Sequence, residues 1–187
     1  MGVLDLEECQ QQFEQIGERA KALAEGLTET QFTWRPEPES WSIQECLGHL
    51  TMVGQYEIRL IEKAIQDGRS RGVTGNGPFQ YGWLERRILR ATEPPIRRKF
   101  PAPRRFRPNH GQPVTAILPT FLHVQREFIR MAELSKGLDL VRVRVHTPIS
   151  RFVRFSLGLT LAQQAAHERR HLEQARRVRE NPEFPGK

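Results

Sequence analysis

The chain has 187 residues, 37% of them hydrophobic and 27% charged, a composition that is typical of one globular domain large enough to bury a core. No apolar run reaches the about 20 residues of a membrane-spanning helix, and the acidic N-terminus lacks the pattern of a secretory signal, so we expect a single domain over 1–187 in the cytoplasm. The net charge of +7 comes almost entirely from one segment with six basic residues, 97–107, so it does not by itself indicate nucleic-acid binding.

Two amphipathic helices are predicted in the first third of the chain. The first runs from about Leu4 to Leu27, where apolar residues recur at the helical period. The second begins at Ser42, because Glu45 follows three residues later and completes a capping box, and it ends near Gly68. Trp41 precedes this cap and is expected to pack against the first turn as a hydrophobic staple.

A long irregular connection is predicted over 68–112, with one short helix in "YGWLERRILRA". A connection of this length in a helical bundle is typical of a crossover between two parallel helices. The basic segment 97–107 lies within it, is rich in proline, and is predicted to be an exposed loop. Its expected roles are solubility or the attraction of an anionic small molecule; nucleic-acid binding is a weaker alternative.

Two more helices are predicted in the last part of the chain. One runs from about Pro113 to Lys136, and the other begins at Thr160, where Gln163 indicates a second capping box. Between them, "VRVRVHTP" alternates as a short extended piece without a recognisable partner, and "ISRFVRFSLG" is predicted to be a helical turn. The fold class is therefore predicted to be all-α, a four-helix bundle with a long crossover between its second and third helices.

The stretch "AAHERRHLEQ" contains the H-E-x-x-H pattern of zinc proteases. His167 and His171 lie four residues apart on one helix, so both rings can reach one metal ion. The protease interpretation fails because Gln174 and Arg177 occupy the positions where the extended motif has Gly and His. A chance pair of boundary histidines is the alternative to a metal site.

A third ligand must come from elsewhere in the chain, and His49 on the second helix is the best candidate. It lies among semi-apolar residues that are expected to face another helix. His110 and His146 fall in loops, and His123 lies off the apolar stripe of its helix. Three histidines from facing helices would leave an open coordination position, as in catalytic sites. Cys46, one turn before His49, is either a fourth ligand or, more in keeping with its apolar setting, a core residue.

The sequence resembles the DinB/YfiT-like superfamily. The resemblance rests on "WSIQECLGHL" (Trp41, Ser42, Glu45, His49 and Leu50) and on "HERRHLEQ" (His167, Arg170, His171 and Gln174), and it covers about Leu4 to Pro185. It implies a four-helix bundle with a metal triad made by one histidine of the second helix and an H-x-x-x-H pair of the fourth. The long basic loop departs from the family pattern.

The resemblance further implies a Zn²⁺ or Ni²⁺ site and thiol-dependent transfer chemistry, with a low-molecular-weight thiol such as bacillithiol or mycothiol as cosubstrate. We therefore expect a metal-dependent enzyme that activates a thiol or water for attack on a small-molecule substrate, a transferase or hydrolase. The alternative is a non-enzymatic bundle that binds a metal, a small molecule or a partner. Glu168, Tyr56 and Glu57 are the candidate acid–base residues. The sequence allows a homodimer without determining the oligomeric state.

Overall fold

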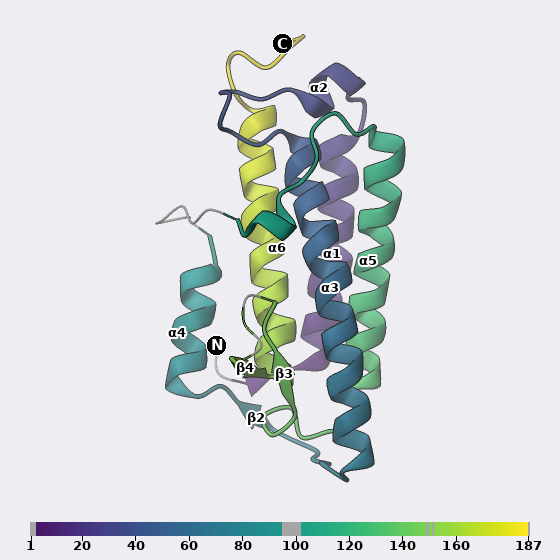
Figure 1. Ribbon diagram of the computed structural model, residues 1–187, viewed down its shortest axis with the longest axis vertical. Coiled ribbons are helices and arrows are strands. Elements are labelled where there is room, and N and C mark those ends of the chain that lie inside the picture. Colours follow the sequence, from purple (N-terminus) through teal and green to yellow (C-terminus); the bar gives the residue numbers. More distant parts are fainter. Residues whose placement is uncertain (1–2, 95–101, 149, 151, 187) are drawn as a thin grey trace.

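Four long helices dominate the computed structural model, which describes residues 3–94, 102–148, 150 and 152–186 (Figure 1). They are α1 (Leu6–Ala24), α3 (Ile43–Ser70), α5 (Val114–Leu134) and α6 (Leu157–Arg179). Helices α1 and α3 each pack against both α5 and α6. Helices α3 and α5 run in the same direction, opposite to α1 and α6 (Figure 1). The predicted all-α bundle, with a crossover between its second and third long helices, is therefore confirmed.

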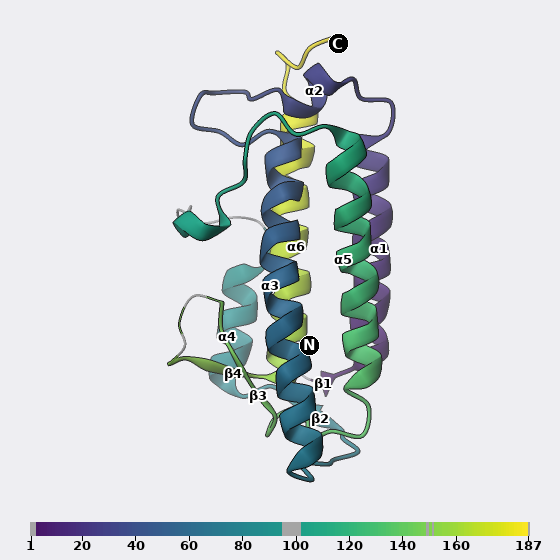
Figure 2. The ribbon, with the colours of Figure 1, turned by 45° about the vertical axis from the view of Figure 1, so that its right-hand side comes forward.

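The shorter elements lie around this bundle. They are α2 (Glu29–Thr33), α4 (Trp83–Thr92), a 3₁₀ turn η1 (Arg104–Phe106), and the strands β1 (Val3–Leu4), β2 (Phe79–Gln80), β3 (Arg144–His146) and β4 (Arg154–Ser156). Strand β1 pairs antiparallel with β2, and β3 with β4. Helix α4 stands outside the four long helices and packs on α6 (Figure 2). None of the described helices is long and apolar enough to cross a membrane.

The start of α3 agrees with the sequence prediction. The backbone N–H of Glu45 donates to Oγ of Ser42 at 3.1 Å, and the backbone N–H of Ser42 donates to the Glu45 carboxylate at 3.0 Å. These reciprocal bonds satisfy two N–H groups that a helix N-terminus otherwise leaves unpaired. The capping box therefore fixes the register of α3, and with it the direction in which His49 points.

The start of α6 differs from the prediction. The helix begins at Leu157, because the Ser156 side chain caps it by accepting from the backbone N–H of Leu159. Thr160 lies inside the first turn and donates to the Ser156 carbonyl. The expected helical turn before it is instead strand β4, which is the partner that β3 was predicted to lack. Arginine and phenylalanine recur every third residue in this stretch and do not alternate, so the local pattern did not indicate a strand.

The connection 68–112 is less irregular than predicted, since it contains β2, the expected α4 and η1. Part of the basic segment, 97–101, lies outside the described residues. We call the described part that leads into α5, residues 102–113, the strap. Its Arg104, Arg105 and Arg107 are exposed, as predicted for this loop. Phe106, however, is only 5% exposed, so the strap is docked on the bundle through an apolar anchor.

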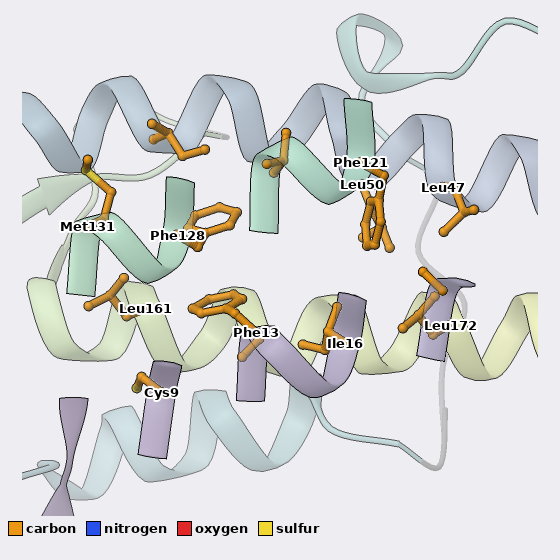
Figure 3. Packing of buried hydrophobic residues seen from close by; sticks show 14 of the residues in the cluster. Cys9, Phe13, Ile16, Leu47, Leu50, Phe121, Phe128, Met131, Leu161 and Leu172 are labelled. Carbon is orange, nitrogen blue, oxygen red and sulfur yellow. The ribbon is translucent and has the colours of Figure 1, made fainter. Parts of the chain in front are cut away.

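The core fills the space between the long helices. Phe13 of α1 stacks on Phe128 of α5, with ring centroids 4.8 Å apart, and Figure 3 shows these two rings facing each other between aliphatic side chains of all four helices. Such stacking brings large apolar areas together and contributes beyond simple burial. The bundle is thus held mainly by apolar packing between the four long helices.

Helix α3 lies close to α5 at Gly54, and this contact gives a stability prediction. A Cβ atom added at Gly54 would lie 2.5 Å from Cγ1 of Val124 and 3.1 Å from the Phe128 ring. Overpacking of this kind costs about 1–3 kcal/mol, against a gain of about 1 kcal/mol in helix propensity. We expect Gly54→Ala to lower the free energy of unfolding by up to about 2 kcal/mol in urea titrations.

Gly17→Ala in α1 is the matched control. A Cβ atom there would lie 3.6 Å from Leu122, an ordinary contact, so the propensity gain of up to about 1 kcal/mol should remain. Equal effects of the two substitutions would show that the α3–α5 contact is looser than the structure has it.

Candidate metal centre

Three histidines from two helices converge at one point of the bundle. His49 comes from α3, and His167 and His171 come from consecutive turns of α6. One nitrogen of each ring lies within 4.8 Å of the corresponding nitrogen of the other two, and Nε2 of His49 is 3.4 Å from Nε2 of His167. Among the described residues, this is the one group of three or more His, Cys, Asp or Glu side chains with metal-binding spacing.

The spacing of the nitrogens suits a transition metal. Two nitrogens bound to one zinc ion at about 2.0–2.1 Å in a tetrahedral arrangement lie roughly 3.4 Å apart. The His49–His167 separation equals this distance. The other ring nitrogens lie within 4.8 Å of one another, so the side chains would draw together around one ion. The residues present therefore fit a divalent ion with imidazole ligands.

Hydrogen bonds to the far side of two rings orient them for this role. Nδ1 of His49 donates to the Phe106 carbonyl at 2.7 Å, since a carbonyl can only accept. Nδ1 of His171 lies 3.0 Å from Oε1 of Gln174. Both bonds place the proton on Nδ1 and leave the unprotonated Nε2 free to bind a metal ion. Such outer partners fix the tautomer and the ring orientation of metal ligands.

Trp41 covers the group from the segment between α2 and α3. Its ring centroid lies 4.9 Å from that of His49 and 5.6 Å from that of His171, with the latter pair stacked. The sequence predicted only a staple on the first turn of α3. The one sequence feature that could have predicted this contact is the position of Trp41 directly before the capping box, where the chain bends into α3. Trp41 excludes water from one side of the group.

The environment keeps the three rings neutral. Burial lowers the pKa of His49, although the bond to the Phe106 carbonyl acts in the other direction. Burial and the two neighbouring rings hold the pKa of His167 well below its ordinary value. Burial, then His49, lower the pKa of His171 to about 3. Neutral imidazole is the form that binds metals, so few protons compete for the site near neutral pH.

The candidate acid–base residues lie elsewhere. Glu168 is 0% exposed, and its carboxylate accepts from Nε2 of Gln164 inside the bundle. Burial raises the pKa of Glu168 to about 8. Glu57 is also buried. Tyr56 is half-buried and contacts Phe106 of the strap, with ring centroids 5.7 Å apart.

The other candidate ligands are not part of the group. Cys46 is 0% exposed and belongs to the hydrophobic core, which favours the packing alternative for this residue. Burial raises the pKa of its thiol. His123 is exposed on α5. His110 lies in the strap, with Nδ1 3.6 Å from the Glu45 carboxylate.

The placement of Glu168 gives a test of the protease-like role suggested by H-E-x-x-H. Glu168 points into the bundle beside Gln164, so it is not expected to be a ligand. Glu168→Gln should therefore keep the metal stoichiometry of the unmodified protein, measured by plasma mass spectrometry after dialysis. A loss of metal in this variant, with the fold intact by circular dichroism, would contradict this placement.

The structure is thus a four-helix bundle in which one histidine of the second long helix and an H-x-x-x-H pair of the fourth could hold a metal ion. The sequence matches the DinB superfamily over residues 12–175, and the chain belongs to this superfamily. A search of curated proteins found no significant match.

Proposed function

We propose that the protein is a metal-dependent enzyme of the DinB superfamily that acts on a small molecule. The single observation that carries the proposal is the convergence of His49, His167 and His171, with one ring nitrogen of each within 4.8 Å of the other two. Zn²⁺ or Ni²⁺ is the proposed ion, since imidazole ligands suit both. A site with three protein ligands leaves a coordination position for a small molecule, which favours catalysis over a purely structural role.

The surroundings of the group support access by a small molecule. His167 and His171 are partly exposed, whereas His49 is buried, so the α6 side is the one from which a small molecule would approach the group. Trp41 and the strap flank it with apolar and aromatic surface. Arg105 lies over the Tyr56 ring at 4.9 Å, which places a positive charge on the strap. These features favour a substrate with an apolar part and a negative charge.

A divalent ion bound here would supply a low-pKa thiol or water as the nucleophile near neutral pH. The contribution of the chain is to hold three neutral imidazoles, to fix their tautomers through Phe106 and Gln174, and to exclude water with Trp41. Transfer to a thiol such as bacillithiol or mycothiol and hydrolysis by water are the two reactions proposed. In the first, a carbon–sulfur bond forms while the leaving group departs with the electron pair of the broken bond.

The second candidate is a non-enzymatic bundle that binds a metal or small molecule. The burial of Glu57 and Glu168 favours it, because neither carboxyl group is exposed to serve a substrate at the histidines. An enzyme can nevertheless act without a carboxylate base, since the metal itself lowers the pKa of the nucleophile.

The two candidates are separated by a turnover assay on protein with a measured metal content. Zinc- and nickel-loaded samples are given bacillithiol, mycothiol or no thiol, together with a chloronitrobenzene or a nitrophenyl ester. Turnover that depends on the metal and disappears in His167→Ala supports the enzyme. Stoichiometric metal without turnover on either probe supports the binding protein. Absence of stoichiometric metal refutes both metal-dependent proposals.

A further inference from the structure

The strap contacts the first half of α3 at two separate points. At the first, Gln44, which is 0% exposed, makes three hydrogen bonds to strap backbone. Its Nε2 donates to the Asn109 carbonyl at 2.8 Å, and its Oε1 accepts from the backbone N–H of Gly111 at 2.9 Å and of Gln112 at 3.4 Å. A buried amide satisfied in this way is costly to detach, since both sides would lose their partners.

At the second point, the last residue of the 3₁₀ turn, Phe106, contacts His49. The turn closes with the backbone N–H of Phe106 donating to the Pro103 carbonyl at 2.9 Å. It turns the Phe106 ring inward against Tyr56 and directs the Phe106 carbonyl at Nδ1 of His49. The Arg105 guanidinium lies 4.7 Å from the centroid of the Phe106 ring and 4.9 Å from that of Tyr56, so it covers the anchor from outside.

These two contacts connect the surface loop to the metal group. We infer that Gln44 and Phe106 are positioning residues, and that the strap docked by them holds His49 in the tautomer and orientation that a metal ion requires. When the strap detaches, His49 loses the only acceptor at Nδ1 among the described residues, and its ring can rotate or move its proton to Nε2. The inference rests on the proposed metal ligands.

Linkage makes the relation reciprocal. If the docked strap favours metal binding by a given factor, metal binding must disfavour detachment of the strap by the same factor. Loss of an outer partner of a metal-bound histidine typically weakens metal affinity by about 10–100-fold. We therefore expect zinc to reduce the population of the detached strap by roughly 10-fold or more.

Limited proteolysis of the unmodified protein tests this coupling. Trypsin can cut after Arg104 and Arg105 only when the strap leaves the bundle, because Phe106 is buried in the docked state. Cleavage of this kind reports the open population when closing is fast. Zinc should slow cleavage at these two sites by roughly 10-fold, measured by mass spectrometry. Arg71, exposed at the end of α3, is the internal control and should be cut at an unchanged rate.

A variant tests the same coupling from the other side. Gln44→Ala should weaken zinc affinity by about 10-fold in a chelator competition titration. Thr51→Val is the control, since this residue is also buried on α3 but its hydroxyl donates to the Leu47 carbonyl of the same helix and not to the strap. It should lose stability without loss of zinc affinity. If Gln44→Ala fails to fold, the proteolysis experiment alone decides.

The outcomes separate this inference from the proposed function. Unmodified protein that binds no zinc overturns both. Protein that binds one zinc ion per chain, while cleavage after Arg104 and Arg105 is unaffected by zinc, overturns the role of the strap and leaves the metal site standing. Equal zinc affinities of Gln44→Ala and the unmodified protein would also overturn the role of the strap while leaving the metal site standing.

Discussion

Replacing His171 with alanine is expected to abolish stoichiometric metal binding. The ring lies at the centre of the group, with centroids 4.8 Å from His49 and 4.7 Å from His167. Its loss would leave two imidazoles, and no other His, Cys, Asp or Glu among the described residues is grouped with them. The loss of affinity should exceed the upper range of about 100-fold that the loss of an outer partner causes.

The measurement is a zinc titration against a chromogenic chelator, followed by dialysis and elemental analysis. His123→Ala is the matched control, because His123 is exposed on a helix and lies outside the group. It should retain one ion per chain. A substantial decrease in the His123 variant, or full retention in the His171 variant, would mean that the ion binds elsewhere.

Replacing Glu57 with glutamine is expected to remove a pH-dependent loss of stability. Burial, and next the nearby Glu168, raise the pKa of Glu57 to about 8, from an ordinary value near 4.5. Between these pH values the folded protein keeps a proton that the unfolded chain releases. The free energy of unfolding therefore falls as the pH rises through this range.

The size of the effect follows from the shift. One proton of difference changes the free energy of unfolding by about 1.4 kcal/mol per pH unit, so a loss on the order of 3 kcal/mol is expected between about pH 5 and pH 8. Glutamine has nearly the same shape and no charge. The stability of Glu57→Gln relative to the unmodified protein should increase steadily over this interval.

Urea titrations at several pH values, with chelator present, measure this difference. The histidines of the metal group act in the opposite direction, because their pKa values are lowered, but they are common to both proteins and cancel in the comparison. Glu62→Gln, a more exposed carboxylate on the same helix, serves as the surface control. A stability difference that stays constant with pH would show that Glu57 is ionised in the folded protein.

Local signals explain which parts of the structure the sequence could predict. The Ser42–Glu45 capping box and the four-residue spacing of His167 and His171 depend on residues that are close along the chain, so the sequence alone predicted both. The apolar periodicity predicted the four long helices for the same reason. The selection of His49 required one further step, that a histidine on a semi-apolar helix face points to another helix.

The features that were missed depend on contacts between distant segments. Strand β4 exists because it pairs with β3, and this pairing outweighs the weak helical preference of its residues. Glu168 lies beside the ligands in sequence, yet it turns inward, because successive residues of a helix point about 100° apart. The acceptor for His49 is a backbone carbonyl, which no sequence motif marks.

The order of the helices determines when the histidines can meet. His49 and His167 are separated by 118 positions, and the later pair lies on the last helix, α6. A contact over so long a loop forms only after the intervening chain has collapsed. During synthesis on the ribosome, α1, α3 and α5 emerge before either ring of the pair. A metal ion bound by these three histidines would therefore not nucleate folding, as it does in zinc fingers, but would enter a bundle whose first three long helices are already made.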